Sequence, residues 1–394
     1  MVYRSGTWGI SDTRSQILSN RWIPDTPAGD LGCIFSWGSN ECGQLGDGTV
    51  IPRSSPNSIP GTNWIYIASG EKHAAGIKAD GTLWSWGENC VGQLGDGTQF
   101  PRSSPVQITG SWFSLAASGK HTSATKSDGT LWTWGLNLCG QLGDNNALGN
   151  FPRSSPVQVP GNNWSRITNS FNSTYAVNST GCLFSWGGNE FGQLGDYTVQ
   201  PRSSPVQICG SCWEKVCSGH CHALAIKCDN TLWVWGANYY GQLGISTSCI
   251  PMGGGSNVGG LPDRSSPIQI AGNWFSVAGG QQSSYATDQS GGIWSWGHNS
   301  VGQLAGSTGS GPNCGTINVA SICTNGCWRN LVAAGANHVM ALSCCNLLYT
   351  GGNNTCGQLG SVSLSESNGL TQRTSLNTWT SVSSSGDSSY AIKS

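Results

Sequence analysis

Short apolar runs separated by turn residues recur along the whole chain. The clearest example consists of four runs, at residues 64–68, 73–78, 82–86 and 106–108. The second run ends at Asp80-Gly81, a strong hairpin signal, and the third alternates small and large side chains as a strand does. Since no segment shows the 3.6-residue period of a helix, we predict a unit of four short strands joined by turns.

This unit recurs because a ten-residue motif, Trp-Gly-x-Asn-x-x-Gly-Gln-Leu-Gly, occurs seven times without slippage. In the second copy the later motif positions are Asn89, Gly92 and Leu94. The motif begins at Trp37, Trp86, Trp134, Trp186, Trp235, Trp296 and Gly351, of which the last has lost its aromatic ring. Four antiparallel strands repeated around an axis are typical of a β-propeller, so the sequence predicts an all-β protein with seven four-stranded blades.

The two ends of the chain predict how the ring closes. Residues 379–394 match residues 64–79, which are the first two strands of a unit, while the chain from Leu31 matches the last two strands. We therefore expect one blade to be shared by N-terminal and C-terminal strands, which removes exposed sheet edges. The predicted organisation is a closed propeller over residues 31–394 and an arm, residues 1–30, outside the repeats.

The repeated residues have structural interpretations. Gly92 supplies backbone angles that a side chain would hinder, Asn89 can bond to backbone in its turn, and Leu94 can pack between blades. One further position holds a histidine in four units, which we expect to bond to backbone: His73, His121, His222 and His338. No nucleophile, base and acid are singled out together, so the sequence favours a non-enzyme without cofactor or metal.

Composition narrows the possible partners. Only 9% of residues are charged, the net charge is −1, and Lys and Arg do not cluster, so a nucleic-acid partner is not expected. No run of about 18 apolar residues is present, so we expect no membrane span. The first residues lack the apolar core of a secretion signal, and we expect a cytoplasmic or virion- or assembly-associated location.

Seventeen cysteines leave their chemistry open. Cys42, Cys139 and Cys356 share one motif position with apolar residues of other units, which indicates small buried hydrophobes. A denser group invites a zinc interpretation, although its members are spread over several strands and turns: Cys209, Cys212, Cys217, His220, Cys221, His222 and Cys228. Free thiols are the default expectation, with disulfides and zinc as alternatives.

The motif, preceded by segments such as Gly119-Lys120-His121-Thr122, resembles the repeat of the regulator of chromosome condensation family. The resemblance covers residues 31–394 and implies the propeller fold. Members of that family include a guanine-nucleotide exchange factor, a plant ultraviolet-B photoreceptor and a β-lactamase inhibitor. The photoreceptor's Gly-Trp-Arg-His-Thr motif is absent, since the aligned places read Gly70-Glu71-Lys72-His73 and Gly219-His220-Cys221-His222.

The places where the repeat is interrupted are the candidate partner-binding sites. Spacings between successive Gly-Gln-Leu motifs are 49, 48, 52, 49, 61 and 55, and the two longest correspond to insertions at 245–263 and 306–326. The candidate residues come from the arm and these insertions: Trp8, Trp22, Ile245, Met252, Asp263, Cys314 and Cys323. We expect a protein-binding or structural module, as a homo-oligomer or in a larger assembly such as a virion or extracellular appendage. The alternative is a regulator of a small GTPase similar to an exchange factor.

Overall fold

The computed structural model describes residues 32–145, 151–161, 163–245, 262–305, 313–319, 328–363, 366–373 and 378–393. These residues form β-strands joined by turns and loops and contain no helix. In chain order the strands are β1 (Cys33–Gly38), β2 (Arg53–Ser58), β3 (Trp64–Ser69), β4 (His73–Lys78), β5 (Leu83–Gly87), β6 (Arg102–Ile108), β7 (Trp112–Ser118), β8 (His121–Lys126), β9 (Leu131–Gly135), β10 (Arg153–Gln158), β11 (Trp164–Asn169), β12 (Ser173–Asn178), β13 (Leu183–Gly187), β14 (Arg202–Gln207), β15 (Trp213–Ser218), β16 (His222–Lys227), β17 (Leu232–Gly236), β18 (Arg264–Ile270), β19 (Trp274–Gly279), β20 (Ser283–Asp288), β21 (Ile293–Gly297), β22 (Asn313–Val319), β23 (Trp328–Ala334), β24 (His338–Ser343), β25 (Leu348–Gly352), β26 (Ser367–Gln372), β27 (Trp379–Ser385) and β28 (Ser388–Lys393).

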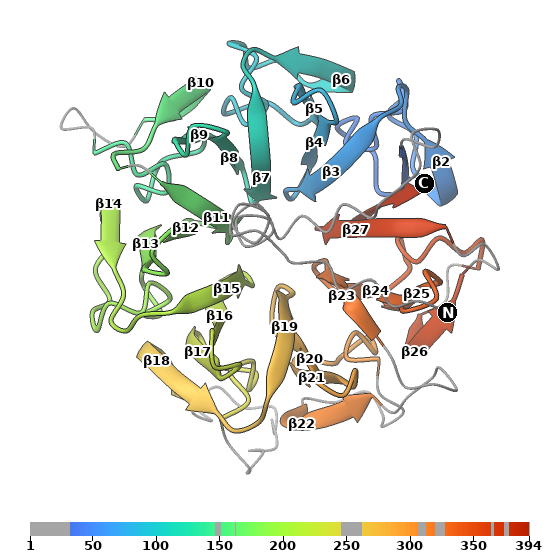
Figure 1. The fold of residues 1–394 in the computed structure, drawn as a ribbon. Helices are drawn as coiled ribbons and strands as arrows, with labels where there is room; N and C mark the ends of the chain where they lie inside the picture. Colours follow the sequence, from blue (N-terminus) through green and yellow to red (C-terminus); the bar gives the residue numbers. More distant parts are fainter. Residues whose placement is uncertain are drawn as a thin grey trace, which may run out of the picture.

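The strands form seven four-stranded antiparallel sheets arranged around a central axis (Figure 1). The innermost strand of each sheet points toward the axis, and these strands are β3, β7, β11, β15, β19, β23 and β27. Each inner strand contacts the inner strand of the next sheet, including β27 with β3, so the ring is continuous. The predicted seven-bladed β-propeller is confirmed.

Ring closure also follows the prediction. One sheet has the order β2-β1-β28-β27, which joins the two ends of the described chain in a single blade. Its two central strands are β1 and β28, in which Cys33 pairs with Lys393 and Trp37 pairs with Ser389. Every other blade is built from four consecutive strands, so this shared sheet alone holds the ring shut.

Burial explains why the sequence pattern differs among the four strands of a blade. The second strand is buried along nearly its whole length, as in His73–Lys78, because neighbouring blades cover both faces of its sheet. The third strand alternates at first, with Leu83 and Ser85 buried and Trp84 partly exposed. The outer strands are largely half-exposed, which suits their Arg-Ser-Ser-Pro sequences.

Two outer strands lack that signature, and one of them corrects a sequence-based boundary. The segment 306–326 was predicted to be an insertion, yet Asn313–Val319 within it is strand β22, whose Val319 pairs with Ile293 of β21. The blade requires a fourth strand at this place, and an Asn-Cys-Gly-Thr sequence supplies it without the Arg-Ser-Ser-Pro signal. The fourth strand was therefore mistaken for part of a loop.

Adjacent blades are joined by the motif tryptophans, which are fully buried. The indole Nε1 of Trp86 donates to the backbone carbonyl of Gln44 in the preceding blade at 2.8 Å, and Trp235 donates to Gln193 at 2.8 Å. The same bond joins three further pairs: Trp37 with Gln358, Trp186 with Gln141, and Trp296 with Gln242. Each such tryptophan therefore fills apolar space and satisfies a buried carbonyl at the same time.

The last glycine of the motif makes room for this indole. At Gly195 an added Cβ would lie 2.8 Å from Trp235 Nε1, and the backbone has a φ of +73°. At one junction the tryptophan is replaced by Gly351, and there the motif ends in Ala305 instead of glycine. A Cβ on Gly351 would come within 3.3 Å of the Ala305 Cβ, so these two positions face each other as Trp235 and Gly195 do.

We expect Gly195→Ala to destabilise the protein by about 2–4 kcal/mol, because left-handed backbone strain adds to overpacking against the indole. Ala305→Gly is the matched control, since Ala305 already has a φ of 53° and faces no indole. That control should change the free energy of unfolding by no more than about 1 kcal/mol. Urea unfolding followed by tryptophan fluorescence measures both, and equal effects would contradict the indole-accommodation argument.

Candidate binding face

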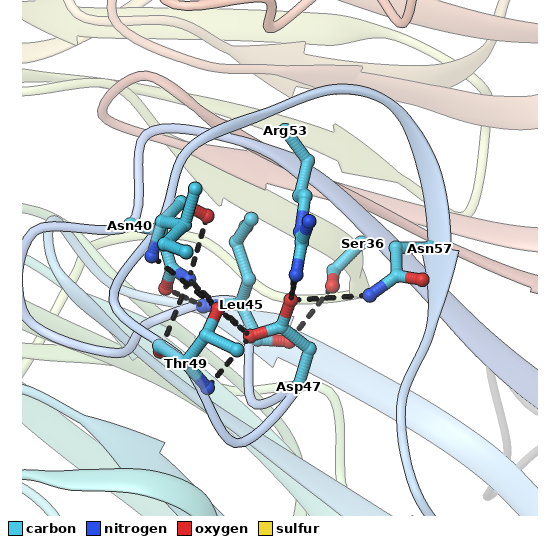
Figure 2. A network of polar contacts seen from close by, with 8 residues as sticks. Ser36, Asn40, Leu45, Asp47, Thr49, Arg53 and Asn57 are labelled. Atoms are coloured by element: carbon cyan, nitrogen blue, oxygen red, sulfur yellow. Dashed lines mark hydrogen bonds and ion pairs between the residues drawn. The ribbon is translucent and has the colours of Figure 1, made fainter.

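The long loop between the third and fourth strands of a blade is held by a polar network (Figure 2). Asn40 Oδ1 accepts a hydrogen bond from the Leu45 amide at 2.9 Å, and its Nδ2 donates to the carbonyls of Thr49 and Ile51. Asp47 accepts from the Thr49 amide and hydroxyl at 3.0 and 2.7 Å. These bonds satisfy the loop's backbone groups internally, so the loop has a defined shape.

An ion pair fastens this loop to the outer strand. Arg53 approaches Asp47 Oδ2 at 2.9 Å through both Nε and Nη2, and the Asp47 side chain is only 2% exposed. Burial raises the pKa of Asp47, but hydrogen bonds from Thr49 and Arg53 outweigh that effect and hold it below its usual value. Three other blades have the same ion pair: Arg102 with Asp96, Arg153 with Asp144, and Arg202 with Asp196.

The repeated histidines join neighbouring blades. His73 Nε2 lies 2.9 Å from Thr122 Oγ1 of the next blade, and that hydroxyl donates to the carbonyl of Gln93 at 2.9 Å. Because the Thr122 hydroxyl donates its proton to the carbonyl, it can only accept from His73. The Nε2 atom of His73 therefore carries a proton and donates it to this hydroxyl. Burial lowers the pKa of His73 to about 3, which keeps the ring neutral.

The same arrangement corrects the expectation that these histidines bond to backbone. His121 lies 3.0 Å from Thr174 Oγ1, and His222 and His338 each lie 2.8 Å from a serine hydroxyl of the next blade. The imidazole ring is long enough to reach the hydroxyl of the next blade. An alignment of the repeats within one chain does not show such contacts between blades. The repeated histidine is therefore a junction residue, and its chemistry is used within the fold.

Two sets of loops emerge on one face of the ring. The end of a third strand pairs with the beginnings of both the second and the fourth strands, as when Gly87 pairs with His73 and with Arg102. The hairpin before the second strand and the motif loop before the fourth strand therefore lie on the same side. We call this side the motif face, and the turns at the other ends of the strands form the opposite face.

Exposed apolar side chains concentrate on the motif face. Among the large hydrophobic residues that are exposed in the described part of the chain, Phe275 alone lies outside the motif loops. The others all lie between the third and fourth strand of a blade: Val50, Ile51, Phe100, Leu138, Phe151, Phe191, Tyr197, Val199, Tyr239 and Val362. Phe100 and Leu138, from adjacent blades, are 71% and 70% exposed. Single exposed hydrophobics are ordinary, but their concentration on one face makes the motif face the candidate contact surface.

The described charges on this face are largely paired with one another. Lys72 lies 3.5 Å from Glu41, and Lys120 lies 3.4 Å from Glu88. Each pair joins a hairpin of one blade to the motif loop of the preceding blade. The motif face thus presents apolar side chains among locally neutralised charges and no basic stripe within the described residues.

A cavity of about 600 Å³ opens between the inner strands and the hairpins of all seven blades. Its charged or titratable lining includes Glu71, Lys72, His220 and Asp387. His220 Nδ1 lies 3.1 Å from Cys221 Sγ, but burial raises the pKa of Cys221 to about 12 and lowers that of His220. Activating a cysteine nucleophile requires the opposite shifts, so this pair is not arranged for catalysis.

A family model of the RCC1-like domain matches residues 33–391. The chain belongs to the RCC1-like domain family. The resemblance inferred from the repeat motif is confirmed, and it extends over almost the whole part of the chain in which that motif recurs.

Solved structures similar to this RCC1-like domain are also complete propellers. Prp20p from Saccharomyces cerevisiae is 21% identical, with a TM-score of 0.79 over 93% of this chain and 92% of that chain. Yeast RCC1 (Prp20) bound to Kap60 is 20% identical, with a TM-score of 0.81 over 100% and 96%. Human WBSCR16 is 18% identical, with a TM-score of 0.80 over 92% and 98%. At these identities the similarity shows the fold alone.

Only some of the residues predicted to bind partners lie in the part of this RCC1-like domain that the structure describes. Ile245 and Asp263 flank the first insertion, and Asp263 Oδ1 accepts a hydrogen bond from the Asn238 amide at 2.8 Å. Cys314 lies in strand β22. The other candidates, Trp8, Trp22, Met252 and Cys323, lie outside the described residues. The exposed apolar residues of the motif loops were not anticipated, although several of them, such as Val50 and Phe100, follow the Gly-rich turn within a few residues, which is a usable signal.

The cysteine group of the RCC1-like domain is divided between two sides of a blade. Cys212 and Cys228 flank one end of the β15–β16 hairpin, whereas His220 and Cys221 lie in the turn at its other end. Among the described residues, no three His, Cys, Asp or Glu side chains are grouped to hold a metal ion. Twelve described cysteines are free, including the half-buried Cys42, Cys139 and Cys356, and Cys344 is disulfide-bonded.

The part of this RCC1-like domain that the structure describes contains no helix with the length and apolar character of a membrane-spanning segment.

Proposed function

We propose that this protein is a non-catalytic scaffold that binds a protein partner through the motif face. The observation that carries the proposal is that, among the residues the structure describes, exposed large apolar side chains lie in the motif loops, with Phe275 as the exception. Burying a side chain of this size stabilises a complex by about 1.5–3 kcal/mol, so a few such residues can anchor a partner.

The local geometry supports rigid presentation of these side chains. Phe100 lies in a motif loop whose Asn89 Nδ2 donates to the Phe100 carbonyl at 3.0 Å, and Arg102 pairs with Asp96 at 2.9 Å. A loop already ordered in the free protein loses little conformational entropy on binding. The paired lysines favour a partner surface that is apolar and weakly charged over one that is strongly acidic or basic.

Ile245 and Asp263 lie in a motif loop, between β17 and β18, so we propose that these two residues belong to the same contact surface. The N-terminal arm remains a proposed second contact, because Trp8 and Trp22 could anchor a neighbouring subunit. Membership of a virion or extracellular appendage receives no support from the fold or from the relatives, and it is not part of the proposal.

The test replaces three exposed anchors, Phe100→Ser, Leu138→Ser and Phe151→Ser, in one variant. These side chains are 71%, 70% and 61% exposed, so the variant should fold and melt like the parent protein. Proteins retained by the immobilised wild-type chain from extracts of its source should bind the triple variant on the order of 100-fold more weakly. Phe275→Ser removes an exposed ring away from the motif loops and should leave that binding unchanged.

Equal retention by the wild-type protein and the triple variant would contradict the proposed face.

The main alternative function is nucleotide exchange on a small GTPase, as the family resemblance implies. The yeast Prp20p structure was described together with that protein's binding to Gsp1p and histones. Release of a fluorescent guanine nucleotide from a panel of small GTPases should not accelerate when this chain is added, and a clear acceleration would replace the scaffold proposal.

A further inference from the structure

Two cysteines face each other at the open end of the β15–β16 hairpin. Cys212 immediately precedes Trp213, and Cys228 immediately follows Lys227, the residue that pairs with Trp213. The Cys228 amide donates to the Cys212 carbonyl at 2.8 Å, which holds the two backbone positions together. Both side chains are exposed and neither is in a disulfide.

This geometry is suited to a disulfide. Directly opposed residues of an antiparallel pair have Cα atoms about 4.5–5.5 Å apart, which falls within the range of about 4.4–6.8 Å found across disulfides. Burial and the neighbouring Cys212 side chain both raise the pKa of the Cys228 thiol, as expected for two thiols that lie close together. Closing the bond therefore requires rotation of side chains and little movement of the backbone.

The repeats provide an internal comparison. At the two equivalent positions, the other blades have the pairs Asn63 and Ala79, Ser111 and Ser127, Asn163 and Ser179, Asn273 and Gln289, Cys327 and Cys344, and Thr378 and Ser394. Cysteine thus occurs at both positions or at neither. Cys344 holds the position of Cys228 in its own blade and is disulfide-bonded, so this position of the repeat is compatible with such a bond.

We propose that Cys212 and Cys228 form a reversible disulfide that staples the inner hairpin of their blade. A thiolate of the pair attacks a small disulfide, such as glutathione disulfide, to give a mixed disulfide and release one glutathione. The second thiolate then displaces the remaining glutathione. Two S–H bonds are lost, one S–S bond forms within the protein, and glutathione disulfide is reduced to two molecules of glutathione.

The bond can be located by peptide mapping of the full-length protein. Cleavage after Lys and Arg places Cys212 in residues 203–215 and Cys228 in residues 228–264, and these peptides also contain Cys209 and Cys249. The background variant Cys209→Ser/Cys249→Ser leaves one cysteine in each peptide. After exposure to glutathione disulfide, acid quenching and thiol blocking, we expect the two peptides to be linked and to separate on reduction.

The comparison variant adds Cys212→Ser to this background. The linked peptide should disappear, and Cys228 should carry glutathione instead. Oxidation should raise the melting temperature of the background variant by a few degrees and leave that of the Cys212→Ser variant unchanged, because only the former closes a loop. Separate glutathione adducts on both peptides of the background variant, or links from either peptide to residues 216–227, would overturn the proposal.

Discussion

Deletion of residues 379–394 is expected to abolish the folded ring. These residues include β27 and β28, and their removal leaves β1 without the strand that pairs along its whole length. The deletion also removes Trp379 and Ala391, which are buried in one cluster with Trp37, and so leaves Trp37 exposed. Since the remaining two-stranded piece, β1 and β2, cannot bury its faces, we expect aggregation or the loss of cooperative unfolding, measured by circular dichroism and thermal melting.

A circular permutant provides the matched control. Cys33 pairs with Lys393 at one end of the shared sheet, so a short glycine linker can join these ends. New termini after Arg373 and before Thr378 then leave all of the strands β1 to β28 in the chain. The permutant should melt cooperatively, whereas the truncated protein should not. A truncated protein with a native-like melting transition would show that ring closure is not required for stability.

Acidification from pH 7 to pH 5 is expected to destabilise the protein strongly. Burial lowers the pKa of His73, His121 and His222 to about 3 and that of His338 to about 4, from an ordinary value of 6.5. Between those values the unfolded chain binds more protons than the folded chain. Stability from these groups is therefore complete above pH 6.5 and falls as pH decreases, by about 2 kcal/mol per histidine at pH 5.

Four such histidines together predict a loss of about 8 kcal/mol at pH 5, with partly buried His220 and His298 adding in the same direction. The carboxylates with lowered pKa values, such as Asp47 and Asp96, contribute only at lower pH, so they do not blur this window. Urea unfolding at several pH values gives the slope. His121→Asn should reduce the proton uptake by about one, and a flat profile between pH 7 and pH 5 would contradict neutral buried histidines.

The fold was predictable from the sequence because each blade repeats the same local signals. The spacing from Trp86 to Gly92 and the turn at Asp80-Gly81 recur in nearly fixed register, so seven weak predictions reinforce one another. The half-blade at each end of the chain predicted the shared sheet. The strand β22 was mistaken for part of a loop, because its Asn-Cys-Gly-Thr sequence lacks the Arg-Ser-Ser-Pro signal of most outer strands.

The binding face was less predictable, for a physical reason. Contacts between blades, such as His73 with Thr122, join one position of the repeat to a different position in the next copy, and the register alone does not show which positions touch. Exposure is also a property of the assembled ring, so Phe100 and Leu138 were not distinguished from buried apolar residues. Ala305 opposite Gly351 could have been found, because the two departures from the motif occur in consecutive copies.

Hydrogen–deuterium exchange of the protein with and without its captured partner tests the central claim most directly. If the partner binds the motif face, peptides from the motif loops around residues 96–102, 136–145 and 190–200 should be protected in the complex. The turns of the opposite face, such as residues 79–81 and 127–129, should exchange as in the free protein. Protection confined to those turns, with the motif loops unchanged, would contradict the account.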